Sequence, residues 1–163
     1  IQTFYSIPTG AVGVFVFILF SRAGPLGGLN LLFTPTIMII GQMILIGPLL
    51  MGLTISAISG TDKAIPDTAR SLGASNLQAA VVIIREARFA VMAAVIMGFG
   101  RAISEVGLAL MVGGNIRGFT RIITTAISLE TSKGDIEVSL ALGMILIAIA
   151  LVINIALNRI QQR

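Results

Sequence analysis

The sequence predicts an all-α protein whose helices cross a membrane several times. Of its 163 residues, 56% are hydrophobic and 11% are charged. Soluble domains carry about 25% charged residues, so this chain has too few to cover a surface that faces water. Apolar stretches recur that reach the roughly 20 residues needed to cross a bilayer. We therefore expect one polytopic helical bundle over residues 1–163.

Four apolar stretches define the expected spans, and the chain is expected to continue upstream of Ile1 with one or more further spans. Pro48 lies inside the second stretch, where it frees a backbone carbonyl and permits a kink that serves either packing or gating. Glycines recur in the third and fourth stretches, and small residues let membrane helices approach closely. The expected spans are, approximately, 4–21, 32–58, 89–112 and 138–158.

Lysine and arginine residues set the expected orientation. Six of them fall in the connection at 59–88 and in the C-terminal tail: Lys63, Arg70, Arg85, Arg88, Arg159 and Arg163. Four fall on the opposite side: Arg22, Arg117, Arg121 and Lys133. Because positive residues favour the cytoplasmic side, we expect 59–88 in the cytoplasm and the loop at 113–137 outside.

Several kinds of chemistry are excluded by the residues that the sequence lacks. It contains no Cys and no His, so thiolate and imidazole catalysis and the usual metal ligands are missing. Neither lysine stands in a GxxxxGK[ST] phosphate-binding loop. No basic stripe with interleaved aromatics indicates nucleic-acid binding. We expect no catalytic residue, metal or cofactor in this chain.

A polar segment, "PDTARSLGAS" at 66–75, interrupts the apolar sequence between the second and third spans. Asp67 suits the first turn of a helix, where it meets the positive end of the helix dipole. Gly73 suits the left-handed position that ends a helix. Ser75 with Gln78 forms a capping box, which predicts that a second helix starts directly after Ser75. The residues leave two interpretations open: a knuckle that inserts into a partner, or a connector lying on lipid headgroups.

This segment, continued by "VVIIREAR", resembles the EAA loop of the permease subunits of ABC importers. The family pattern is Glu-Ala-Ala, three residues, Gly, nine residues, Ile, one residue, Leu-Pro. Asp67, Thr68, Ala69, Gly73 and Ile83 take the matching positions, whereas Arg85-Glu86 stands in place of Leu-Pro. The resemblance implies that the loop docks into the cytoplasmic ATPase subunits through a set of coupling residues. They are Asp67, Thr68, Ala69, Arg70, Gly73, Ala74 and Ser75.

Further segments resemble the molybdate, sulfate and tungstate branch of these permeases. "SRAGPLG" and "GFGRAISEVGLALMVGGNIRG" carry that likeness, and "TTAISLETSKGD" is most similar to the tungstate subunits. The resemblance implies the type I importer fold and a homodimer in a prokaryotic plasma membrane. It also implies separate ATPase subunits that bind ATP and Mg, an extracytoplasmic binding protein, and import of tungstate. Import of molybdate or sulfate is an alternative, as is an ATP-independent secondary transporter, although no inverted repeat is evident.

Arg101 and Glu105 are charged residues inside the third expected span. Counted from residue 89, they lie about 18 and 24 Å along the helix, well within a hydrocarbon core of about 30 Å. Their i, i+4 spacing allows them to pair. Two interpretations remain: Arg101 and Glu105 line the translocation path, or they form a structural pair that fixes helix packing.

The loop at 113–137 is expected to contain a short amphipathic helix at the outer surface. Phe119 and Ile122 would lie on its apolar face, opposite Arg121, Thr124 and Thr125. In the family this region faces the binding protein, and the alternative is an interfacial helix without a partner. Its acidic residues are candidates for a docking rim: Glu130, Asp135 and Glu137.

Overall fold

The computed structural model describes residues 8–62 and 64–161, and over them the chain is helical without any strand. This confirms the predicted all-α class. Eight α-helices and one short 3₁₀ turn follow one another along the chain. They are α1 (Thr9–Phe20), η2 (Gly27–Leu29), α2 (Pro35–Ser59), α3 (Ala64–Ser71), α4 (Asn76–Glu86), α5 (Arg88–Ile103), α6 (Gly107–Gly113), α7 (Ile123–Lys133) and α8 (Ile136–Gln161).

Two of these helices are individually long and apolar enough to cross a bilayer. They are α2, with 25 residues and a mean hydropathy of 2.0, and the Ile136–Arg159 part of α8, with a mean hydropathy of 2.8. By contrast, α1 has 12 residues and is about 18 Å long, which is shorter than the hydrocarbon core. The first expected span covered 4–21, of which 4–7 lie outside the described residues.

The third expected span is broken. In place of one helix over 89–112, the chain forms α5 and α6, which meet at 55°. At the break the Ser104 hydroxyl donates to the Arg101 carbonyl (3.0 Å), and the Leu108 N–H donates to Oε1 of Glu105 (3.0 Å). Polar side chains therefore take over backbone groups that a continuous helix would satisfy, which makes the break tolerable.

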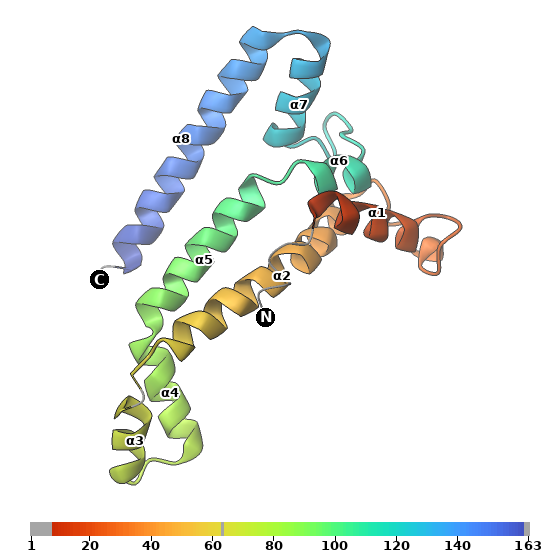
Figure 1. Ribbon diagram of the computed structural model, residues 1–163. Coiled ribbons are helices and arrows are strands. Elements are labelled where there is room, and N and C mark those ends of the chain that lie inside the picture. Colours follow the sequence, from red (N-terminus) through yellow and green to blue (C-terminus); the bar gives the residue numbers. More distant parts are fainter. Residues whose placement is uncertain (1–7, 63, 162–163) are drawn as a thin grey trace.

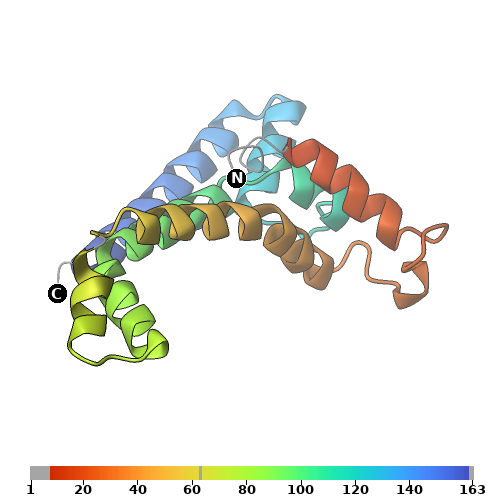
Figure 2. The ribbon, with the colours of Figure 1, turned by 60° about the horizontal axis from the view of Figure 1, so that its bottom comes forward.

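The long helices form an elongated arrangement with a distinct helical hairpin at one end (Figure 1). Helices α2 and α5 pack along each other and lead to the hairpin of α3 and α4. Helix α8 lies beside α5, and α7 folds back against α8 at the other end of the molecule. Turned by 60°, the view shows the α3–α4 hairpin separate from the bundle (Figure 2).

The buried apolar core sits where α1, α2 and α6 cross, at the far end from the hairpin. Its members are Val12, Val16, Phe20, Ile37, Met38, Leu108, Ala109 and Val112. Helix α8 contributes no buried side chain in its apolar window and exposes Leu140, Ile147 and Val152. Such apolar exposure suits contact with lipid or with another membrane subunit.

We predict that Gly98 sets the closeness of the α2–α5 seam, whereas Gly100 does not. A Cβ added at Gly98 would lie 2.9 Å from Cγ of Leu50, whereas nothing lies within 4 Å of one at Gly100. Because overpacking of a close contact costs about 1–3 kcal/mol, Gly98→Val should lower the free energy of unfolding in detergent by that amount. Gly100→Val is the matched control, and Leu50→Ala should restore part of the loss. Equal losses for the two glycines would contradict this assignment.

Candidate functional sites at the polar hairpin and the helix break

The hairpin of α3 and α4 is built by local hydrogen bonds that the sequence largely predicted. Helix α3 begins at Ala64, two residues before Pro66, because Oδ1 of Asp62 accepts the Ala64 N–H (2.9 Å). Gly73 then ends the helix with a φ of 87°. This left-handed conformation suits glycine, and here the Ala74 N–H reaches back to the Ala69 carbonyl (3.0 Å).

The predicted capping box at Ser75 is confirmed. The Gln78 N–H donates to Oγ of Ser75 (3.4 Å), and the Ser75 N–H donates to Oε1 of Gln78 (2.8 Å). Helix α4 therefore starts at Asn76. The two bonds fix the angle at which the chain leaves the glycine turn.

The hairpin exposes large apolar side chains at its tip. Leu72 is 84% exposed and Leu77 is 81% exposed. Between the helices lies a groove of about 400 Å³, to which Thr68 and Ala69 contribute. Asp67 and Arg70 form a loose, exposed ion pair with a 3.7 Å separation between Nη1 and Oδ1. The expected coupling residues thus form a capped, rigid turn with an uncovered apolar tip.

The second site is the break between α5 and α6, where the expected pair of Arg101 and Glu105 is present. Nη1 of Arg101 donates to Oε2 of Glu105 at 2.9 Å. Only 2% of the Glu105 side chain is exposed, against 35% of Arg101. Because Glu105 also caps α6, it lies outside the helix rather than on a shared helix face.

Two further helices reach the same break. The Thr124 hydroxyl of α7 donates to the Glu105 carbonyl (3.3 Å), and Nε2 of Gln42 in α2 donates to the Ala102 carbonyl (3.4 Å). Oε1 of Gln42 is buried without a partner among the described residues. Side chains from α2, α5 and α7 therefore converge on one polar point within the apolar bundle.

The expected faces of the outer helix are wrong. Thr124 and Thr125, expected on the polar face, are 6% and 0% exposed, whereas Phe119 and Ile122 are 57% and 39% exposed. The hydroxyls can be buried because they donate to backbone carbonyls of Glu105 and Ile122. Helix α7 also starts only at Ile123.

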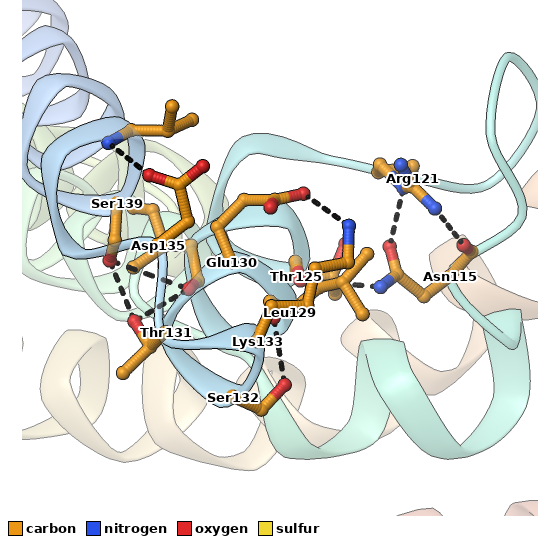
Figure 3. Close-up of polar contacts among 12 residues, drawn as sticks. Asn115, Arg121, Thr125, Leu129, Glu130, Thr131, Ser132, Lys133, Asp135 and Ser139 are labelled. Carbon is orange, nitrogen blue, oxygen red and sulfur yellow. Dashed lines mark hydrogen bonds and ion pairs between the residues drawn. The ribbon is translucent and has the colours of Figure 1, made fainter.

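Arg121 is a candidate that the sequence placed only in an outer loop. Its Nε donates to Oδ1 of Asn115 (3.1 Å) and its Nη2 donates to the Asn115 carbonyl (3.3 Å), as Figure 3 shows. Nδ2 of Asn115 in turn donates to the Thr125 carbonyl (3.3 Å). Arg121 also lines a groove of about 430 Å³. The other lining residues are Ala102, Ile103, Ile122, Ile123, Thr124, Leu146 and Ile149.

Two of the three acidic residues proposed as a docking rim have local partners near the turn between α7 and α8. Glu130 pairs with Lys133 at 2.9 Å, and Oδ1 of Asp135 accepts the Val138 N–H at 3.2 Å (Figure 3). The hydroxyls of Thr131 and Ser139 join the two helices at 2.6 Å. The docking rim itself stays a prediction. Within residues 8–62 and 64–161, no group of three or more His, Cys, Asp or Glu residues could hold a metal ion.

Comparison with known proteins defines the class first. The family model described as "Binding-protein-dependent transport system inner membrane component" matches residues 1–163. The chain belongs to this family, and it is therefore a membrane protein of the transport class. This confirms the resemblance seen in "DTARSLGAS" and "GFGRAISEVG".

Individual relatives narrow the branch. The chain is 45% identical over 157 residues to the tungstate uptake system permease protein TupB of Peptoclostridium acidaminophilum, covering 96% of this chain and 69% of the relative. It is 41% identical over 162 residues to TupB of Campylobacter jejuni, covering 99% and 68%. It is 42% identical over 168 residues to a probable anion ABC transporter permease protein of Haloferax volcanii, covering 100% and 72%.

We predict that the Arg101–Glu105 pair contributes more to stability than an outer pair of the same length. Glu105→Gln leaves the Arg101 guanidinium facing an amide and should lower the free energy of unfolding by about 1–3 kcal/mol. The matched control is Glu130→Gln, whose 2.9 Å pair with Lys133 is more exposed and should contribute below about 1 kcal/mol. Thermal unfolding in detergent checks both. Equal losses of unfolding free energy in the two variants would mean that the burial of Glu105 does not strengthen its pair with Arg101.

Proposed function

We propose that this chain is the permease subunit of an ATP-driven ABC importer that carries tungstate across a prokaryotic plasma membrane. The subunit would cross the membrane several times and pair with a second copy around a central path. Two separate ATPase subunits, which bind ATP and Mg, would dock on the cytoplasmic side. A substrate-binding protein would deliver the oxyanion on the outer side. The chain itself would break no bond.

The observation that carries this proposal is the α3–α4 hairpin. It stands at one end of an apolar bundle, is fixed by its own caps, and exposes Leu72 and Leu77. An uncovered apolar tip on a rigid turn suits insertion into a protein groove better than a flexible connector would, because little conformational entropy is lost on docking. The family name supports a transport assembly driven through a binding protein.

The choice of oxyanion is supported by the relatives. Two of them, from different organisms, are named tungstate uptake permeases and are 45% and 41% identical to this chain. A sulfate permease of Chlamydomonas reinhardtii is 27% identical. We therefore place tungstate before molybdate and sulfate.

Arg101 and Glu105 are proposed to lie on the path. Irregular backbone at membrane depth is tolerated where it is buried in protein or lines a watery cavity. At the break, Glu105 is 2% exposed and four helices contribute contacts, whereas the neighbouring Ser104 is exposed. Arg101, at 35% exposure, retains an open side from which it can contact a passing anion.

Hydrolysis of ATP by the reconstituted complex tests the hairpin. Loaded binding protein should stimulate hydrolysis in the native complex, and Gly73→Trp should abolish the stimulation. The control is Gly143→Trp. A Cβ at Gly143 also meets nothing within 4 Å, and this glycine lies within α8, away from both the hairpin and the expected docking rim. The same loss in both variants, with assembly intact, would contradict docking at the hairpin.

The same liposomes test the substrate. We expect uptake of tungstate that excess molybdate or sulfate inhibits only weakly. Uptake of sulfate in preference to tungstate would support the proposed importer class but contradict the proposed oxyanion. Uptake without ATP would favour a secondary transporter.

A further inference from the structure

Arg121 lies at mid-depth of the bundle, whereas the sequence places it on the outer side. The depth of Arg121 can be estimated from its position along α8. This helix starts at Ile136 and, with 26 residues, is about 39 Å long. The groove that Arg121 lines also contains Leu146 and Ile149. These residues stand about 15 and 20 Å from the start of α8. If α8 spans the bilayer, the Arg121 groove is near the middle of the hydrocarbon core.

The chain reaches this depth because it folds back. Helix α5 ends at the break, α6 runs off at 55°, and α7 starts beside the break and runs to the outer end along α8. Most of the loop between α6 and α7 is exposed, but its last residues return to the bundle, where Thr120 is buried and Arg121 lines a groove with Ala102. Thr120, 2% exposed, anchors it through the Ile116 N–H (2.9 Å) and the Gly113 carbonyl.

The charge of Arg121 is compensated differently from that of Arg101. Arg101 faces the carboxylate of Glu105, whereas no carboxylate of the described residues lies within 4.0 Å of Arg121. Its hydrogen-bond partner is the neutral Asn115, which accepts from two of the five guanidinium N–H groups. Ionised residues inside a membrane are costly and commonly mark substrate or ion pathways. Arg121 is therefore a cation at membrane depth, and three of its five guanidinium N–H groups are not used in the contact with Asn115.

We propose that Arg121 is a binding residue for the tetrahedral oxyanion dianion in transit, held ready by Asn115. This inference rests on the proposed import function. The planar guanidinium can donate in parallel to two oxygens of such an anion. Asn115 fixes the orientation of the guanidinium, since it is itself tied to the Thr125 carbonyl.

The lining of the Arg121 groove suits transient contact with an anion rather than tight binding. Apart from Arg121 and Thr124, the groove is lined by apolar side chains, so an anion there would make few contacts and could leave again. A lipid phosphate is a poorer candidate for this groove, because headgroups lie about 15 Å from the bilayer centre. The anion we assign is therefore the free, transported one.

The chain contains no cysteine, which permits a direct charge-restoration experiment. In the reconstituted complex, Arg121→Cys should lower the maximal rate of tungstate uptake at least tenfold, as expected from loss of a hydrogen bond to a charged group. The KM for loaded binding protein should be unchanged. Modification with aminoethyl methanethiosulfonate restores a cation and should raise uptake at least fivefold. The sulfonatoethyl reagent, of similar size but negative, should not.

The matched control is Arg117→Cys, four residues earlier in the same loop but exposed. Its uptake should stay within twofold of native, with or without either reagent. Treatment of the native complex reveals any effect on cysteines of the partner subunits.

The outcomes separate the inference from the proposed function. Uptake by Arg121→Cys at the native rate would overturn the binding role while the importer stands. Equal restoration by both reagents would also overturn it, because the side chain would then only fill space. If the native complex imports no oxyanion, the proposed function fails, and the binding role fails with it.

Discussion

The carboxylate of Glu105 is the contact on which the arrangement of the apolar helices depends. A chain in a bilayer must satisfy every backbone N–H and C=O within itself, so a membrane helix cannot simply stop. Here one oxygen of Glu105 accepts the N–H of Leu108 in the first turn of α6, and the other accepts from Arg101 at the end of α5. A single side chain thereby allows a 55° turn. Without that turn, α6 could not reach α1 and α2 to form the buried core.

The break also explains how the two ends of the molecule are connected. Helix α2 is continuous from the core to the start of the hairpin. On the way, its Gln42 contacts the break between α5 and α6. Helix α5 leaves the same hairpin and ends at the break. A movement of the hairpin would therefore be transmitted along two packed helices to the same polar point. In the proposed importer, helices α2 and α5 would therefore connect the ATPase contact directly to the oxyanion path.

The features that the sequence predicted are those governed by neighbours along the chain. Ser75 and Gln78 stand three residues apart, and their reciprocal bonds depend on nothing else. The left-handed Gly73 and the pairing of Arg101 with Glu105 are likewise set by local spacing. The family followed from short motifs in the hairpin and the third span, and the comparisons agree.

The features that the sequence did not predict depend on contacts between distant segments. The sequence predicts Thr124 on the polar face of an amphipathic helix, but its hydroxyl is buried and donates to the carbonyl of Glu105, 19 residues away. Arg121 lies in a hydrophilic stretch that no local pattern distinguishes from an outer loop. Its depth follows from the return of α7 along α8, which brings it level with Leu146. Hydropathy read along the chain cannot detect such a return of one segment along another.

The most direct test of this account is whether water reaches the helix break in the assembled complex. Ser104 is exposed at the break, so Ser104→Cys in the cysteine-free chain reports on it, and Ile147→Cys on the apolar surface of α8 is the control. We predict that a membrane-impermeant thiol reagent labels Ser104→Cys in one nucleotide state and not in the other, while Ile147→Cys stays unlabelled. Labelling of neither position in any state would contradict a translocation path at the break.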